Sequence, residues 1–380
     1  MTGTPRLRCW IEVSRSRLAA NFQAVRTLVG AGVSVCPVVK ADAYRHGAVE
    51  VSRILAAEGA PWLAVSSVEE GLTLRQAGID RPRLLVMADL LPYEREALVE
   101  HRLTPVLHAL EDIAPLDRLA ARRGVRLPFH LKIDSGMGRL GTRAQAEEAW
   151  EAIRACPHVQ LEGLMTHLAS AADYIGVQSD EQMRYFDQFC AVLPAAPPLL
   201  HMAGTIAIAY GRRESWRNMV RPGHAIYGYV SPVRVRSGES APPILLDVAP
   251  ALAWKTALIA VKDVPAGARI GYGAIFQAPR PMRIGVLAAG YADGIPHRLS
   301  NRGRVIAAGQ FAPVLGAVSM DVTTIDLSNA PQLRPGDPVT LLGEEGDCRQ
   351  DAQQLAREAG TISYSLLCGI SARVHRLYVD

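Results

Sequence analysis

The feature that most constrains the fold of this chain is an alternation of short apolar runs with amphipathic stretches. About eight apolar runs lie between residues 15 and 230, and helix-like segments such as SVEEGLTLRQAG and RAQAEEAWEAIRA separate them. Buried strands that alternate with helices indicate parallel β-α units. Eight such units in about 220 residues fit a closed β/α barrel. An open doubly wound sheet stays open as an alternative, because periodicity alone does not exclude it.

The pattern changes after Pro232. Residues 232–243 are rich in Ser, Gly and Pro and predict a connection. Strand-like segments dominate beyond it, with one helix expected over residues 351–360. The sequence therefore predicts an α/β fold with a β/α barrel over residues 12–246 and a second, mostly β domain over residues 247–380.

Charge and cysteine usage exclude several classes of protein. The net charge is +4, and the basic residues form no dense run of the kind that binds nucleic acid. No stretch approaches the ~18 apolar residues of a membrane helix, and the first residues lack the apolar core of a signal peptide. The six cysteines form no CxxC pair, and Cys156 with His158 lacks the partners of a zinc site. We expect a cytoplasmic enzyme without a nucleic-acid, membrane or metal partner.

Polar residues follow several of the apolar runs, which is where β/α barrels carry their functional groups. Lys40 directly follows VSVCPVV. Burial of its ammonium would be costly, so it is either a lysine that snorkels to solvent or a desolvated amine that attacks an aldehyde. The polar or small residues after other runs are Arg139, His167, Gly204, Thr205, Arg221 and Gly223. We expect these positions to converge at one mouth of the barrel.

The segment VVKADAYRHG resembles the lysine motif of the alanine racemase family. Other segments resemble the family in order along nearly the whole chain: KIDSGMGRLG, EGLMTHLASA, VRPGHAIYG, IGYGAIF, GYADG, SMD and TISYSLLCGISARV. The resemblance implies a pyridoxal-phosphate enzyme of fold type III, with a (β/α)8 TIM-like barrel and a β-rich C-terminal domain that includes residues 1–11. It also implies a cytoplasmic homodimer that interconverts L-alanine and D-alanine and so feeds D-alanine to peptidoglycan synthesis.

Racemisation needs one proton removed from Cα and another returned to the opposite face. The cofactor supplies the electron sink, so two acid–base groups on opposite faces suffice. By resemblance these groups are Lys40, which holds the cofactor, and Tyr272 of the partner subunit. Taken alone, Tyr272 equally fits a half-buried strand aromatic. The flanking Gly271 and Gly273 would allow another chain to approach closely.

The resemblance also assigns the other site residues. Arg221 donates to the pyridine nitrogen, and because arginine does not readily give up its proton, that nitrogen stays largely unprotonated. Taken alone, Arg221 could be a loop salt-bridge residue and His167 a structural histidine. The further cofactor-binding positions are Tyr44, Arg139, His167, Thr205, Gly223, His224 and Tyr364. The substrate-binding positions are Arg139, Met320, Asp321 and Tyr291. Lys132 matches a lysine that is carbamylated in many relatives, where the carbamate would orient Arg139.

The sequence departs from the family pattern near the site. HMAGT replaces HMANS, so Gly204 stands for an asparagine and Thr205 for a serine. The other departures are His224 for an aliphatic residue, Ala317 for an arginine and Arg45 for a glycine. They leave a serine racemase or a specialised, inhibitor-resistant alanine racemase open. A related decarboxylase, a cofactor carrier without turnover and a metal-dependent hydrolase are weaker alternatives.

Overall fold

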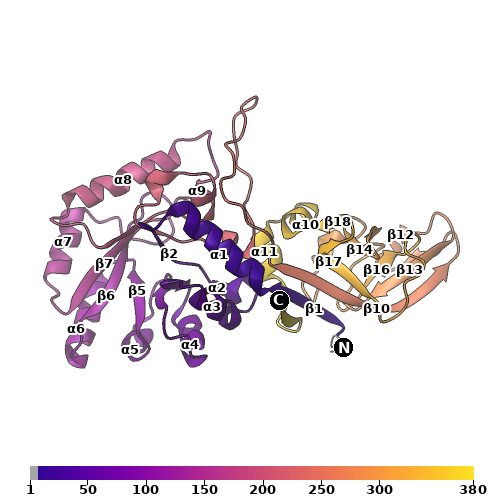
Figure 1. The fold of residues 1–380 in the computed structure, drawn as a ribbon, viewed down its shortest axis with the longest axis horizontal. Helices are drawn as coiled ribbons and strands as arrows, with labels where there is room; N and C mark the ends of the chain where they lie inside the picture. The colour runs from indigo at the N-terminus through magenta and orange to yellow at the C-terminus, as the bar shows by residue number, and fades with distance from the viewer. Residues whose placement is uncertain (1–6) are drawn as a thin grey trace. The chain divides into compact units, whose positions relative to one another are not determined.

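The computed structural model describes residues 7–380, and the chain divides into two compact units (Figure 1). The barrel unit comprises Arg17–Ala43 and Gly47–Ala249. The β unit comprises Met1–Ser16, of which residues 7–16 are described, together with Tyr44–His46 and Pro250–Asp380. We describe each unit by itself. Within residues 7–380, no helix combines the length and the apolar character needed to span a bilayer.

Eight parallel strands of the described chain form the core of the barrel unit. Six make one sheet in chain order: β3 (Trp62–Val65), β4 (Arg83–Val86), β5 (Leu103–Leu107), β6 (Leu127–Lys132), β7 (Val159–Met165) and β8 (Leu199–His201). The other two, β2 (Ser34–Val35) and β9 (Met219–Val220), pair with each other. Val38 pairs with Ala64, and the Arg221 amide donates to the Ala203 carbonyl at 2.9 Å. These links close the ring and confirm the predicted barrel.

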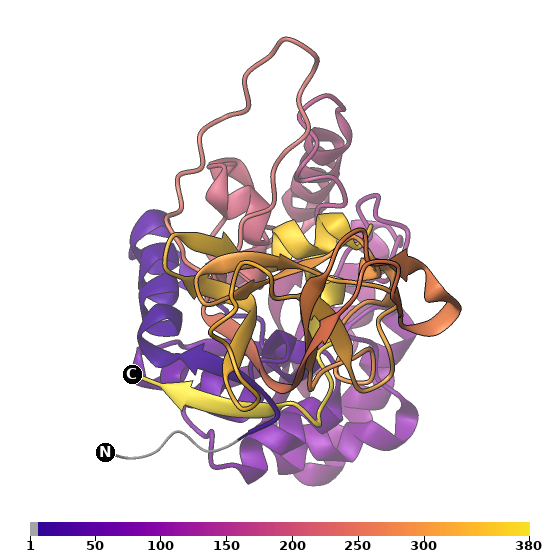
Figure 2. The ribbon, with the colours of Figure 1, turned by 90° about the vertical axis from the view of Figure 1, so that its right-hand side faces the viewer.

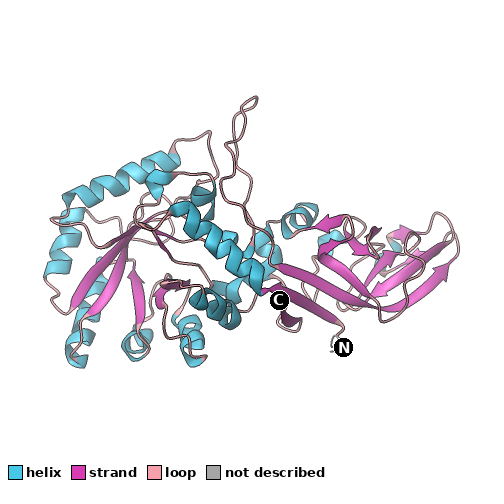
Figure 3. Ribbon diagram, in the orientation of Figure 1, coloured by secondary structure: helices cyan, strands magenta, loops and turns pink. Residues whose placement is uncertain are grey.

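Helices separate the barrel strands and lie outside them (Figure 3). They are α1 (Arg15–Val29), α2 (Lys40–Tyr44), α3 (Ala48–Ala57), α4 (Val68–Gln76), α5 (Arg95–Glu100), α6 (Ile113–Arg123), α7 (Ala146–Arg154), α8 (Gln178–Val192) and α9 (Thr205–Ala209). Local sequence sets their ends: the Ser67 hydroxyl caps α4 by accepting the Glu70 amide, and Gly124 ends α6 in the left-handed conformation. The strands are apolar on both faces because helices cover them outside, and Leu63, Leu84 and Leu131 are fully buried.

A nine-stranded sheet dominates the β unit. Its strands are β1 (Cys9–Ser14), β10 (Leu252–Val264), β13 (Met282–Leu287), β14 (Arg304–Ala307), β15 (Gln310–Pro313), β16 (Thr323–Asp326), β17 (Pro338–Glu345), β18 (Cys348–Gln350) and β19 (His375–Val379). β1 runs antiparallel to β10 and parallel to β19, so the first and last strands lie side by side (Figure 2). Trp254 is fully buried and donates its indole N–H to the Cys9 thiol at 3.1 Å.

The small elements of the β unit lie beside this sheet. They are the hairpin β11 (Arg269–Ile270) and β12 (Phe276–Gln277) and the helices α10 (Ala352–Glu358) and α11 (Ser363–Cys368). α10 is the helix predicted from DAQQLAREAG, and the Asp351 carboxylate caps it by accepting the Gln354 amide. Residues 232–243, whose Ser, Gly and Pro content predicts a connection, form no helix and no strand apart from a single bridge at Arg234.

Candidate active site

Lys40 lies at the end of the first barrel strand, where the backbone changes from an extended to a left-handed helical conformation. The Val39 amide donates to the Ala64 carbonyl at 2.8 Å, but the five residues Ala41–Arg45 all have φ between 52 and 66°. This left-handed conformation costs roughly 1–2 kcal/mol for each non-glycine residue. Two contacts hold the turn: the Glu70 carboxylate accepts the Ala41 amide at 2.7 Å, and the Asp42 carboxylate accepts the Ala48 amide at 2.8 Å. Strain of this size gathers at functional sites.

Positively charged side chains of the barrel unit converge near Lys40. Burial, together with the charges of Arg139, Arg221 and Lys40, lowers the pKa of the Lys132 ammonium to about 8, although the charge of Asp134 acts in the opposite sense. Burial and the charges of Arg221, Lys132, Arg139 and Lys40 together lower the pKa of His167 to about 3. These five side chains therefore share one electrostatic environment. Its excess of positive charge suits an anionic ligand.

The loop that carries Arg139 is shaped by Asp134. One carboxylate oxygen of Asp134 accepts the amides of Gly136, Met137 and Gly138 at 3.1, 2.9 and 2.9 Å. The loop thus folds back over the end of β6, and Arg139 follows it with an exposed side chain. Asp134 therefore acts on the loop backbone and does not neutralise Arg139 by direct contact.

Arg221 is buried directly after β9, with 4 % of its surface exposed. Its Nη1 donates to His201 Nδ1 at 2.6 Å. Its Nη2 donates to the Thr166 and Met202 carbonyls at 2.7 and 3.1 Å and contacts His167 Nδ1 at 3.3 Å. Burial lowers the pKa of the guanidinium to about 10, so it stays charged at neutral pH.

None of these contacts of Arg221 involves a carboxylate, which makes the interpretation as a loop salt-bridge residue wrong. Within residues 7–380, the Arg221 Nε–H has no hydrogen-bond partner. A buried guanidinium with an unused N–H is suited to a ligand that offers a lone pair.

Thr205 organises a second group of donors at the start of α9. Its hydroxyl oxygen accepts the amides of Gly223 and Ala225 at 3.2 and 3.1 Å. Both acceptor positions are then used, and the hydroxyl proton donates to no residue of the described chain. His224, next to Gly223, is buried and stacks on the Tyr229 ring with 4.9 Å between centroids. The replacement of serine by Thr205 therefore keeps a hydroxyl that can bind an anion.

In the β unit, Tyr272 lies in the turn between β11 and β12 and is 77 % exposed. Its interpretation as a half-buried strand aromatic is therefore wrong. Gly271 precedes it with φ 75°, and a Cβ there would lie 3.3 Å from the Ala317 amide nitrogen. Only glycine allows this turn to pack so closely on the loop that carries Ala317.

Three neighbouring loops of the β unit present apolar side chains to solvent. The Tyr291 amide donates to the Ser319 carbonyl, and the Ala292 amide donates to the Met320 carbonyl, both at 3.0 Å. The exposed apolar side chains of these loops are Tyr272, Ile275, Tyr291 and Met320. We call these four residues the exposed apolar patch.

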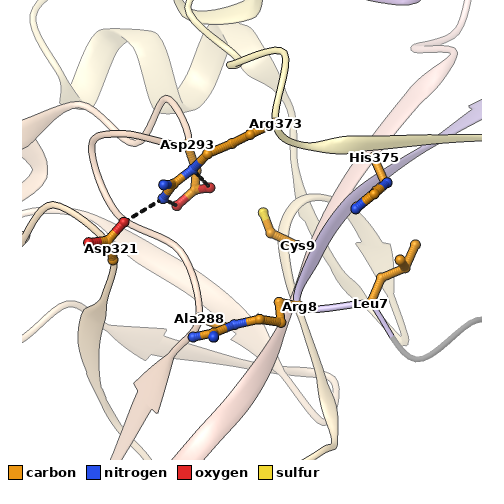
Figure 4. A pocket seen from close by; sticks show the side chains of 8 residues that line it. All are labelled: Leu7, Arg8, Cys9, Ala288, Asp293, Asp321, Arg373 and His375. Atoms are coloured by element: carbon orange, nitrogen blue, oxygen red, sulfur yellow. Dashed lines mark hydrogen bonds and ion pairs between the residues drawn. The ribbon is translucent and has the colours of Figure 1, made fainter.

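Asp321 faces a cavity of about 420 Å³ in the β unit (Figure 4). Arg373 donates to both carboxylate oxygens of Asp293 at 2.7 and 2.8 Å and to Asp321 at 2.8 Å (Figure 4). Asp293 is buried and also accepts the Gly290 amide at 2.8 Å. Arg373 thus ties the loop of Tyr291 to the loop of Met320.

Tyr44 and Tyr364 form a ring pair in the β unit, with centroids 5.9 Å apart. Burial raises the pKa of Tyr364 to about 12 and raises that of Tyr44 further, so both hydroxyls are donors at neutral pH. Arg45 donates from Nε to the Cys368 carbonyl, at the end of α11, at 3.2 Å. This contact gives a physical role to the arginine that replaces the family's glycine, since a cation at a helix C-terminus is favourable.

The comparisons with known proteins decide the family. A family model described as "Alanine racemase, N-terminal domain" matches residues 13–232, and one described as "Alanine racemase, C-terminal domain" matches residues 251–378. The chain belongs to the alanine racemase family. It is 38% identical to an alanine racemase of Halothermothrix orenii over 97% of this chain and 96% of that protein. It is 36% identical to one of Synechocystis over 98% of this chain and 100% of that protein.

Solved alanine racemase structures share the fold. The enzyme from the D-cycloserine producer Streptomyces lavendulae is 30% identical, with a TM-score of 0.89 over 100% of this chain and 98% of that chain. The Bartonella henselae enzyme, described with covalently bound pyridoxal phosphate, is 24% identical, with a TM-score of 0.86 over 98% of this chain and 100% of that chain. The resemblance inferred from the motifs and the predicted fold class are confirmed.

Several residues that shape the alanine racemase site were not found from the sequence. Asp134 and Arg373 lie inside family-like segments, but nothing in those segments indicates which amides or carboxylates they bind. His201 lies in the apolar run LLHMAG, where a single histidine indicates a buried core residue and not a functional one. The signal in each case is a polar side chain within an otherwise apolar or glycine-rich segment.

Proposed function

We propose that the chain is a pyridoxal-phosphate-dependent racemase that interconverts L-alanine and D-alanine. The observation that supports it most is the charged, buried Arg221, which contacts His167 and has an Nε–H that no described residue uses; Arg221 and Lys40 both act on the charge of His167. When bound, the cofactor would draw electron density from the amino-acid Cα and so make its proton removable. The excess positive charge of the site and the unused Thr205 hydroxyl proton fit the anionic groups of this cofactor.

Lys40 would hold the cofactor through Nζ and would exchange a proton on one face of Cα. Arg221 would offer its Nε–H to the pyridine nitrogen and keep its own proton, since its pKa of about 10 lies well above neutral pH. His167 would stay neutral beside the ring, because burial and the nearby cations lower its pKa to about 3. Within the barrel unit, Thr205, Gly223 and His224 would bind the phosphate. For Tyr44 and Tyr364, this role rests on the family resemblance alone.

Tyr272 would exchange the proton on the opposite face, in the active site of a partner subunit. The support is its 77 % exposure on a turn fixed by Gly271, together with the family resemblance. The exposed apolar patch would then be covered by a second copy of the chain in a homodimer. The same approach would bring Met320 and Tyr291 to the substrate, with Asp321 orienting that loop through Arg373.

Lys132 is proposed to be carbamylated. An amine whose pKa is about 8 is partly neutral near pH 8 and can add to carbon dioxide, forming a C–N bond and releasing one proton. The product would carry a negative charge near the positive charge of Arg139. Arg139 would in turn bind the carboxylate of the substrate. We further propose that the enzyme works in the cytoplasm, where it would supply D-alanine for peptidoglycan precursors.

A chiral product assay over a panel of small amino acids tests the proposed function. Purified, cofactor-loaded protein is incubated with each L-amino acid, and both enantiomers and released carbon dioxide are measured. We expect alanine to be the best substrate and no carbon dioxide to appear. Alanine among the poorest substrates would overturn the assignment, and carbon dioxide release would indicate a decarboxylase.

A further inference from the structure

A series of polar side chains leads away from Arg221 through the interior of the barrel unit. We call Arg221, His201, His130, Glu162 and Arg83 the polar series. Arg221 Nη1 contacts His201 Nδ1 at 2.6 Å, and His201 Nε2 contacts His130 Nδ1 at 2.8 Å. His130 Nε2 faces the Glu162 carboxylate at 3.7 Å. Glu162 binds Arg83 through two contacts, one of 2.7 Å. The proposed function uses only the first of these residues.

The polar series crosses the barrel from the carboxyl ends of the strands to their amino ends. His201 and His130 come from β8 and β6 and are fully buried. Arg83 begins β4, and its guanidinium lies 4.0 Å above the Trp62 ring at the start of β3. The barrel interior therefore connects the Arg83–Glu162 ion pair with the buried guanidinium of Arg221.

The hydrogen bonds from Arg221 to Glu162 can run in only one direction, which fixes the tautomers of both histidines. Arginine donates and never accepts, so His201 Nδ1 must be an acceptor and His201 carries its proton on Nε2. That proton makes His130 Nδ1 an acceptor, and His130 must then carry its proton on Nε2, facing the Glu162 carboxylate. A second proton on either ring would bring two N–H groups face to face.

The environment supports the neutral form of both histidines. Burial, followed by the charge of Arg221, lowers the pKa of His201 well below its usual range. Burial also lowers the pKa of His130, although Glu162 acts in the opposite sense. Glu162 itself stays ionised: burial opposes this, but His130 and Arg83 together hold the pKa of its carboxyl at about 2.

The backbone leaves space for His130. A Cβ on Gly163, in β7, would lie only 2.6 Å from His130 Nδ1. Glycine at this position lets the imidazole lie against the neighbouring strand, between His201 and Glu162. The sequence of β7 therefore provides both the carboxylate that ends the chain and the space that the histidine occupies.

We propose that His201, His130 and Glu162 are positioning residues that fix the orientation of Arg221 and keep its guanidinium a donor toward the cofactor. The cofactor side of this inference rests on the proposed function, whereas the tautomers of the two histidines do not. Loss of His130 leaves the His201 Nε2–H without an acceptor. His201 can then rotate or change tautomer, and Arg221 loses the acceptor at Nη1.

Four variants test the proposal. His130→Leu removes both polar atoms of the ring, whereas His130→Gln restores an acceptor and a donor in the same order. Glu162→Gln removes the terminal charge and keeps the shape. Glu96→Gln is the matched control, because Glu96 forms an exposed ion pair with Arg123 that has no connection to Arg221.

The first measurement is ¹⁵N NMR of histidine-labelled apo-protein, with assignments from His201 and His130 variants. In the wild type we expect both rings to carry the proton on Nε2 and neither to titrate between pH 5.5 and 9. In Glu162→Gln, both rings should still carry the proton on Nε2, since the donor Arg221 sets the direction and the glutamine carbonyl still offers an acceptor to His130. A His130 that carries its proton on Nδ1 in folded Glu162→Gln, or imidazolium signals for either ring in the wild type, would overturn the inference.

The second measurement is the dissociation constant of pyridoxal phosphate, with kcat and KM alongside. We expect His130→Leu to weaken cofactor binding about tenfold and to lower kcat more than it changes KM. His130→Gln should recover most of both effects, and Glu96→Gln should match the wild type. Wild-type cofactor affinity and kcat in folded His130→Leu would refute the role. If that variant does not fold, Glu162→Gln and His130→Gln decide.

The two hypotheses fail in different ways. A protein that neither binds the cofactor nor racemises alanine would refute the proposed function. The histidine tautomers of the apo-protein would still show whether the hydrogen bonds of the polar series run in the proposed direction. A protein that racemises alanine but whose histidines titrate near pH 6.5 would end only this inference.

Discussion

Replacement of Thr205 by valine should destabilise the barrel unit and weaken cofactor binding. Thr205 Oγ1 accepts two buried amides, those of Gly223 and Ala225, at 3.2 and 3.1 Å. Valine has nearly the same shape but accepts nothing, so two buried N–H groups lose their partner. Each such loss costs about 1–3 kcal/mol, and we expect the free energy of unfolding to fall by roughly 2–4 kcal/mol in total.

The assay is thermal unfolding of the apo-protein, followed by titration with pyridoxal phosphate. For a unit of this size each kcal/mol lowers Tm by about 2–4 °C, so Thr205→Val should melt about 4–16 °C below the wild type. Thr205→Ser keeps the hydroxyl, and is the matched control, expected within about 3 °C of the wild type. A Tm of Thr205→Val equal to that of Thr205→Ser would refute the argument from the two amides.

Three other predictions concern single groups. Tyr272→Phe should lower kcat by at least ~100-fold with cofactor affinity unchanged, because the side chain is exposed in its own subunit; kinetics with a cofactor titration checks this, and unaltered kcat would refute the two-base scheme. Lys132→Met should raise stability at pH 7 in carbon-dioxide-free buffer. Because the folded-state pKa of Lys132 is about 8 against an ordinary 10.5, the wild type should recover stability as pH rises from about 8 to 10.5; a constant difference in chemical denaturation across that range would contradict it. Gly163→Ala should lose about 1–3 kcal/mol of unfolding free energy by overpacking against His130, and an unchanged urea midpoint would disprove the close fit.

Much of the fold could be predicted because barrel strands are buried on both faces. The apolar runs near Trp62, Arg83, Thr104, Phe129 and Leu161 correspond to β3–β7, and the runs before Lys40 and around Leu199 and Met219 complete the ring. The change of pattern after Pro232 likewise predicted the strand-rich second part. In each case the local periodicity carries the information, since it depends on which face is covered.

The left-handed turn after Lys40 could not be predicted, because KADAYR contains no glycine to indicate positive φ. The backbone there is held by contacts that the local pattern does not indicate, such as that between the Ala41 amide and the distant Glu70 carboxylate. The family resemblance supplied Lys40, Arg221 and Thr205 as candidates, but not the hydrogen bonds that fix them.

The contacts of the polar series from His201 to Arg83 could not be predicted for a similar reason. Its members come from four strands, and only closure of the barrel brings them together. A lone histidine in FHLKID or LLHMAG has no sequence signal that distinguishes a core residue from a link in a polar chain.

Covalent attachment of pyridoxal phosphate to Lys40 is the central claim, and borohydride reduction tests it most directly. Cofactor-loaded protein is reduced, digested and analysed by peptide mass spectrometry. We predict that the cofactor mass is fixed on Nζ of Lys40, and on no other lysine in comparable amount. A protein without visible absorbance after loading, or a Lys40 peptide of unmodified mass, would contradict the account.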